Sequence, residues 1–146
     1  MTLNDKQVLE LMHRESYVSE DDARKAEEYA KRYGASPLDY LLAQRLVTKG
    51  IVGQAIAESR GIPFADLNSY PPTRETVLRI EESAAKAARV IIFKDDPTGV
   101  VIASDDPDRA KAFIEKLRAL KPSAKLALAY ALPEDMDRAF MHYLKP

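Results

Sequence analysis

One segment of the chain occurs twice, and this repeat constrains the N-terminal part of the fold more than any other feature. The first copy runs from Glu15 to Ala26 and the second from Gln44 to Ala55. Each copy has an apolar pair, then a hydroxyl residue (Ser19 or Thr48), then apolar residues at helical spacing. Serine and threonine favour helix N-caps because their side-chain oxygen accepts a hydrogen bond from an unpaired amide of the first turn. Each copy therefore predicts a connection followed by a helix.

The residues around the two copies extend this pattern to two helix pairs. Residues 1–13 carry apolar residues along one helical face, and acidic residues follow Ser19, where they favour the positive end of a helix dipole. Glycine ends helices readily because it adopts the left-handed conformation. The predicted caps and stops are Ser19, Gly34, Ser36-Pro37, Thr48 and Gly61. We therefore predict a helical subdomain over residues 1–61.

A different pattern follows Gly61 and predicts a mixture of strands and helices. Pro63–Leu67 is expected to be extended, and Pro71-Pro72-Thr73 to open a helical stretch with Val77, Leu78 and Ile80. A short helix over Glu82–Ala88 should follow. The apolar runs 90–93 and 100–103 flank the turn residues Asp95–Gly99, which predicts a β-hairpin.

The C-terminal part predicts a second helix, a third strand and a last helix. Asp106-Pro107 opens an amphipathic helix whose apolar face is Ala110, Phe113, Ile114, Leu117 and Leu120. Lys125–Tyr130 is the expected third strand, and Pro133 opens a helix with Met136, Ala139, Phe140 and Tyr143 inward. A strand, helix and strand of these lengths predict a crossover connection. The predicted class is α+β: tandem helix pairs over 1–61, then a small α/β subdomain over 62–146 with a mixed sheet of three strands or slightly more.

Composition excludes several classes of function. The chain has no cysteine, which excludes disulfides, thiolate metal sites and a thiol nucleophile. A net charge of −1 provides no basic field for nucleic acid, so we expect no nucleic-acid partner. No apolar run is long enough to span a membrane, and the N-terminus does not resemble a signal peptide. We expect a cytoplasmic protein without direct membrane insertion, which could still dock at a membrane through a partner.

The sequence shows no spacing typical of an active site. His13 and His142 are far apart, and no zinc-protease, serine-hydrolase or Walker A motif occurs. The acid pairs Asp95-Asp96 and Asp105-Asp106 fall at a predicted turn and a helix start, where aspartate is expected for structural reasons. We therefore predict no catalytic residues, no metal and no cofactor, and a small enzyme is the least supported of three hypotheses.

Two features of the helical part have a structural and a functional interpretation. Gly50 and Gly53 lie in a predicted helix, where close helix packing is favoured over ligand contact. Basic residues gather in the same part of the sequence. They form either a solvated helix surface or a surface for an anionic ligand or an acidic partner. These residues are Lys31, Arg32, Arg45, Lys49 and Arg60.

The segment Leu41–Leu67 and two later motifs carry a resemblance to a known family. They are the leucine pair at Leu41, the step Leu46-Val47-Thr48, Ala57-Glu58, Gly61-Ile-Pro-Phe-Ala-Asp-Leu67, Arg89-Val-Ile91, and Ala103-Ser-Asp-Asp-Pro107. In this order they resemble the N-terminal domain of type II secretion and type IV pilus assembly ATPases (the GspE/PilB family), over about residues 15–143.

That resemblance implies a non-catalytic domain that couples a hexameric ATPase motor to an inner-membrane platform. No Walker A or Walker B motif occurs in this sequence. We therefore expect a fragment or a stand-alone copy of the domain that does not hydrolyse ATP. The partners implied are the platform protein and, in a longer chain, the motor domain. The predicted contact residues are exposed ones around the second repeat: Arg45, Lys49, Gln54 and Arg60.

In one branch of that family, two tandem motifs bind cyclic di-GMP, and the resemblance makes a nucleotide sensor the alternative function. Each motif opens with Arg-Leu-Gly, has a glycine before a Leu-Ile step, and ends in glutamine. Here the opening positions hold Gln7-Val8-Leu9 and Ser36-Pro37-Leu38, the glycine positions Ser16 and Arg45, and the glutamine positions Ala30 and Ser59. The arginine that stacks on a base and the glycine that admits it are missing. We therefore predict no tight binding of cyclic di-GMP.

Overall fold

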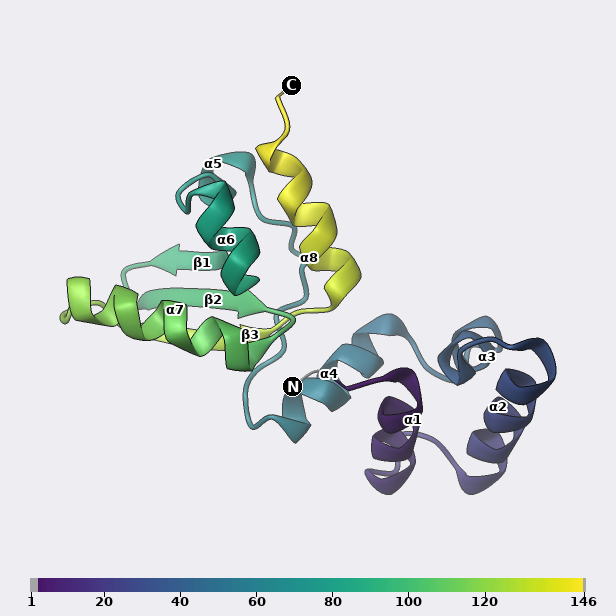
Figure 1. The fold of residues 1–146 in the computed structure, drawn as a ribbon. Coiled ribbons are helices and arrows are strands. Elements are labelled where there is room, and N and C mark those ends of the chain that lie inside the picture. Colours follow the sequence, from purple (N-terminus) through teal and green to yellow (C-terminus); the bar gives the residue numbers. More distant parts are fainter. Residues whose placement is uncertain (1–2, 146) are drawn as a thin grey trace. The chain divides into compact units, whose positions relative to one another are not determined.

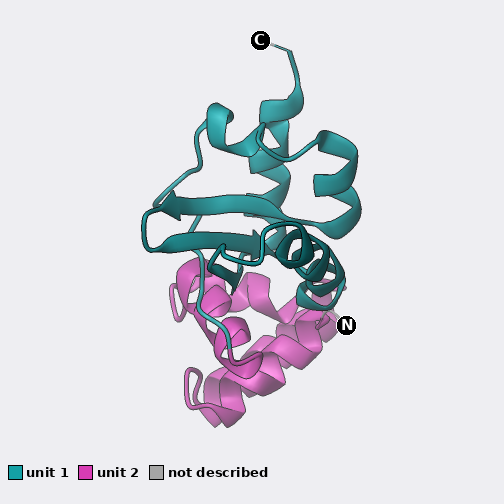
Figure 2. Ribbon diagram, turned by 90° about the vertical axis from the view of Figure 1, so that its left-hand side faces the viewer, with its two compact units in different colours: residues 1, 62–146 teal, residues 2–61 magenta. Residues whose placement is uncertain are grey.

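A computed structural model describes residues 3–145 of the chain, which divide into two compact units. We call residues 3–61 the helical unit and residues 62–145 the α/β unit; Figure 2 colours them separately. Together they contain helices and a three-stranded mixed sheet, so the predicted α+β class is confirmed. Within residues 3–145, no helix combines the length and the apolar character that a bilayer crossing requires.

The helical unit consists, within its described residues, of four helices (Figure 1). They are α1 (Asp5–Arg14), α2 (Glu20–Tyr33), α3 (Pro37–Ala43) and α4 (Lys49–Ser59). Three of the N-caps are the predicted residues Ser19, Ser36 and Thr48, each accepting a hydrogen bond from an amide of the first turn. The first helix begins later than predicted, because Asn4 is its N-cap and forms a capping box with Gln7 in the first turn. Residues 1 and 2 of the predicted first helix lie outside the described residues.

The α/β unit begins with an extended segment and ends with a short 3₁₀ turn. Its elements are α5 (Arg74–Val77), α6 (Glu82–Ala88), β1 (Ile91–Asp96), β2 (Gly99–Ser104), α7 (Pro107–Leu120), β3 (Leu126–Tyr130), α8 (Pro133–Phe140) and η1 (Met141–Tyr143). The predicted hairpin is confirmed, since β1 pairs antiparallel with β2. The predicted crossover is confirmed as well, because β2 pairs parallel with β3 across α7.

Within the Gly61–Leu67 motif, residues 63–65 lie extended beside β3, whereas Gly61 and Leu67 lie in turns, so the segment predicted as extended is shorter than expected. The amide of Ala65 donates to the carbonyl of Tyr130 at 2.7 Å, and the amide of Tyr130 donates to the carbonyl of Pro63 at 2.8 Å. Ala65 and Leu67 are buried. The motif therefore pairs with the sheet through its backbone and contributes two apolar side chains to the core.

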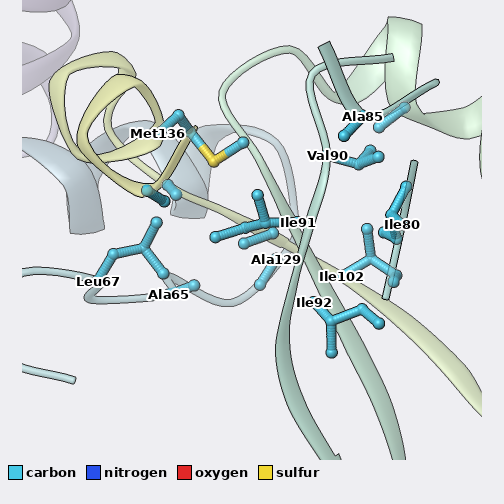
Figure 3. Close-up of a cluster of buried hydrophobic side chains, with 14 of the residues drawn as sticks. Ala65, Leu67, Ile80, Ala85, Val90, Ile91, Ile92, Ile102, Ala129 and Met136 are labelled. Carbon is cyan, nitrogen blue, oxygen red and sulfur yellow. The ribbon is translucent and has the colours of Figure 1, made fainter. Parts of the chain in front are cut away.

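Side chains from both faces of the sheet form the core of the α/β unit. Adjacent residues of a strand point to opposite faces, and both Ile91 and Ile92 are buried. Figure 3 shows Ile91 on the side of Met136 and Leu67, whereas Ile92 lies with Ile102. The sheet is therefore covered on both faces, which makes the α/β unit a layered structure.

Two local predictions are wrong, and one residue of a predicted apolar face is exposed. Asp95 and Asp96 lie in β1 and not in the turn. The side chain of Asp96 accepts a hydrogen bond from the amide of Thr98, which holds the turn tight directly after the strand. Helix α5 ends at Val77, so Leu78 and Ile80 follow the helix instead of belonging to it. Leu120 is 79% exposed, because the last turn of α7 borders a groove that nothing in this unit fills.

Candidate functional site

The sequence repeat corresponds to a repeat of backbone structure in the connections α1–α2 and α3–α4. In the first connection, the amides of Tyr17 and Val18 donate to the carbonyl of Met12. In the second, the amides of Leu46 and Val47 donate to the carbonyl of Leu41. The two connections therefore close their preceding helices with the same hydrogen bonds, 29 positions apart in the sequence.

Each connection contains one residue in the left-handed region of backbone conformation. Ser16 has φ 65° and Arg45 has φ 58°. The family resemblance implies that these two positions correspond to the glycines of the cyclic di-GMP motifs. Glycine adopts this region without the steric cost that a Cβ atom imposes. The backbone at both positions thus keeps a conformation that suits glycine, although the side chains are those of serine and arginine.

A chain of hydrogen bonds joins the first connection to α4. The hydroxyl of Tyr17 donates to Oε2 of Glu58 at 2.7 Å, and Nε2 of Gln54 donates to Oε1 of Glu58 at 3.0 Å. The bonds from Gln54 and Tyr17 lower the pKa of Glu58, and the bond to Glu58 raises the pKa of Tyr17. Gln54, a predicted contact residue, is therefore already engaged within the helical unit.

The structure spreads the predicted contact residues along α4 and does not gather them at one point. Arg45 is exposed in the connection before the helix, and Lys49 is its first residue. Arg60 is the C-cap at the other end. An α-helix rises 1.5 Å per residue, which separates the backbones of Lys49 and Arg60 by about 16 Å. Such a distribution suits contact with an extended partner surface better than the enclosure of a small ligand.

The acidic pairs have structural partners. Asp95 accepts from Nη1 of Arg79 at 2.5 Å, and Asp106 caps α7 through the amide of Arg109. Asp96 accepts from Thr98. Among residues 3–145 no group of three or more His, Asp or Glu side chains is arranged to hold a metal ion. These contacts agree with the structural interpretation of the acidic pairs.

Sequence reasoning missed a partly buried ion-pair cluster around Arg89. Nε and Nη2 of Arg89 donate to the two carboxylate oxygens of Asp105 at 3.0 and 2.5 Å, and Nη2 also donates to Asp137 at 3.0 Å. The guanidinium lies 5.1 Å from the ring centre of Phe140. The bonds to Asp105 are the main cause of a raised pKa of Arg89. No sequence spacing links these residues, so only the folded chain identifies the cluster.

Comparison with known proteins identifies the family of this chain. The sequence profile of the MshEN domain matches residues 60–146, more than half of the chain. The chain belongs to the MshEN domain family. The resemblance to the N-terminal domain of type II secretion and type IV pilus ATPases is therefore confirmed. A search of curated proteins gives no match.

Solved structures agree with the fold. The structure of MshE with cdg has a TM-score of 0.55 and 21% identity, and the match covers 94% of this chain and 98% of that chain. Two crystal forms of the N-terminal domain of XpsE have TM-scores of 0.48 and 0.49 at 16% and 17% identity. Each match covers 97% of this chain, and 97% and 98% of the respective XpsE chains. At this level of identity, the similarity to MshE establishes the fold.

Proposed function

We propose that this chain is a non-catalytic adaptor domain of a type II secretion or type IV pilus assembly ATPase. It docks the motor to an inner-membrane platform protein and works at the cytoplasmic side of that membrane. The observation that carries the proposal is membership of the MshEN family over residues 60–146. The contacts of the acidic pairs support the absence of catalysis in this proposal, because these side chains already form a helix cap, a turn and an ion pair.

The docking surface proposed here is the part of the second repeat that carries Arg45, Lys49, Gln54 and Arg60; the first three are exposed and Arg60 is half-buried. Its basic residues favour an acidic face on the platform protein. We also propose that residues 1–61 and 62–146 are two separate domains, with the motor domain as a further partner in a longer chain.

A binding titration with the purified cytoplasmic domain of the platform protein tests this function. The wild-type chain should bind, and the double variant Arg45→Glu/Lys49→Glu should bind at least about tenfold more weakly. The control is Lys6→Glu/Arg14→Glu, which makes the same change of charge on α1, outside the basic cluster. No binding by the wild-type chain would count against the adaptor. Equal loss in both double variants would count against the surface alone.

A nucleotide sensor is the second candidate. Its support is the similarity to the structure of MshE with cdg and the two left-handed positions Ser16 and Arg45. Against it stand the residues at the motif positions, which lack the stacking arginine and the glycine. We expect no micromolar or tighter binding of cyclic di-GMP in an isothermal titration. Saturable heat in that range would favour the sensor over our prediction.

A further inference from the structure

A continuous apolar groove runs between α6 and α7 in the α/β unit. One cavity of about 530 Å³ is lined by alanines of α6 and by Phe113, Leu117 and Leu120 of α7. A second cavity of about 480 Å³ continues from it toward β1 and β2. The two share Ala84, Phe113 and Leu117, which joins them into one groove.

The walls of this groove suit a helix. Ala84, Ala87 and Ala88 form the α6 wall, and Ala112 adds a fourth alanine from α7. Side chains this small allow another backbone to approach closely. At one end Leu120 is 79% exposed, although it continues the apolar face of α7. An apolar stripe of an amphipathic helix fills such a groove by the same packing as between helices of one chain.

The charges around the groove indicate the chemistry of its occupant. Among the described residues that line the two cavities, the basic ones are Arg79, Arg109, Lys116 and Lys121, and the acidic ones are Glu81 and Asp95. Asp95 is already paired with Arg79 at 2.5 Å. From α7 onward, the described lining residues include three basic side chains, Arg109, Lys116 and Lys121, and no acidic one. The α7 side of the groove is therefore positively charged.

We propose that the α6–α7 groove binds an amphipathic helix of a protein partner that carries acidic residues beside its apolar stripe. Apolar side chains of the partner lie against Phe113, Leu117 and Leu120, and its carboxylates face Lys116 and Lys121. A membrane surface fits less well, because a flat bilayer leaves a concave wall unfilled. This surface lies on the α/β unit and is independent of the second-repeat surface proposed above.

Two synthetic peptides test the proposal on the full chain. Both have about 18 residues, enough to follow the length of α7, with leucines at every third or fourth position. One carries glutamates beside the leucines, and its counterpart carries lysines at the same positions. Isotope-labelled chain is titrated with each peptide and, separately, with vesicles of anionic phospholipid. We expect the glutamate peptide to shift the amide signals of Ala84, Ala87, Leu117 and Leu120, and the lysine peptide to bind at least about tenfold more weakly.

Matched variants separate the groove from a general charge effect. Lys116→Glu/Lys121→Glu should weaken binding of the glutamate peptide about tenfold or more, and Leu120→Ser should weaken it while leaving the fold intact. Lys94→Glu/Lys111→Glu makes the same change of charge at exposed positions that line neither cavity, and should bind as the wild type does. Three results would overturn the proposal: no groove shifts at millimolar peptide, equal binding of both peptides, or groove shifts caused by vesicles and not by peptide.

Discussion

Nη2 of Arg89 lies 2.5 Å from Oδ2 of Asp105, and the side chain of Asp105 is only 8% exposed. Arg89 is the C-cap of α6, two residues before β1, and Asp105 follows β2 two residues before α7. The same guanidinium contacts Asp137 of α8. One arginine thus connects the ends of two neighbouring strands to the last helix of the α/β unit.

Replacing Asp105 by asparagine should destabilise the chain by about 3 kcal/mol, because it leaves a partly enclosed guanidinium without its principal counter-charge. Urea unfolding measures this as a shift of the midpoint. The control is Asp137→Asn, which removes the more exposed partner of the same arginine (67% exposed) and should cost less than about 1 kcal/mol. Equal losses of stability in the two variants would show that the burial of Asp105 does not determine how much its ion pair contributes.

Local sequence signals predicted most of the fold because its elements begin and end with recognisable residues. Ser19, Ser36 and Thr48 cap their helices as expected, and the left-handed Gly34 ends α2. Element ends that depend on tertiary contacts were not predictable in this way. Strand β1 extends to Asp96 because pairing with β2 continues to Gly99, a register that the turn residues alone do not specify.

The candidate site was less predictable than the fold, because its properties arise from residues distant in the sequence. The sequence predicts Gln54 as an exposed contact residue, yet its side-chain amide donates a hydrogen bond to Glu58. Glu58 also accepts a hydrogen bond from Tyr17, which is 41 positions away in the sequence. The Arg89 cluster and the α6–α7 groove each combine residues of separate elements. The only local signals were the alanines of α6 and the apolar Leu120, and neither specifies what lies opposite.

Gly99→Ala should destabilise the chain by about 2 kcal/mol, since it combines steric overlap with a backbone conformation (φ 144°) that side chains rarely adopt. An added Cβ would lie 2.9 Å from the carbonyl oxygen of Lys125, which accepts from Val100. Gly50→Ala is the contrasting variant: its Cβ would meet only Oγ1 of Thr48 at 3.7 Å. It should stabilise α4 by about 0.5 kcal/mol. The structure does not show the close helix packing predicted at Gly50, because an added Cβ would meet only Thr48. Thermal and urea unfolding distinguish the opposite signs expected for the two variants, and a loss of stability in Gly50→Ala would contradict this expectation.

Asp66→Asn should make the stability less dependent on pH in acid. The Asp66 carboxylate accepts from the amides of Asn68 and Ser69 and from the hydroxyl of Ser69. These bonds, the Ser69 amide first, lower the pKa of Asp66 below its ordinary 3.8. A lowered pKa stabilises the fold fully above pH 3.8, and this contribution disappears as the pH falls through the folded-state pKa. The free energy of unfolding of the two proteins should therefore differ at pH 7 and converge as the pH is lowered past 3.8. If the difference in the free energy of unfolding stays constant with pH, the charged form of Asp66 is not what stabilises the fold.

Arg45→Gly should leave the free energy of unfolding within about 0.5 kcal/mol of the wild type, even though glycine usually weakens a structured segment. At φ 58° the arginine already occupies the left-handed region, so glycine relieves strain there while it adds entropy to the unfolded chain. Gln54→Gly is the matched control in the middle of α4, where glycine should cost about 1 kcal/mol and also remove the bond to Glu58. Urea unfolding of both variants measures the contrast. If Arg45→Gly is as costly as Gln54→Gly, the second connection does not hold the left-handed conformation in solution, and its equivalence to a glycine position is lost.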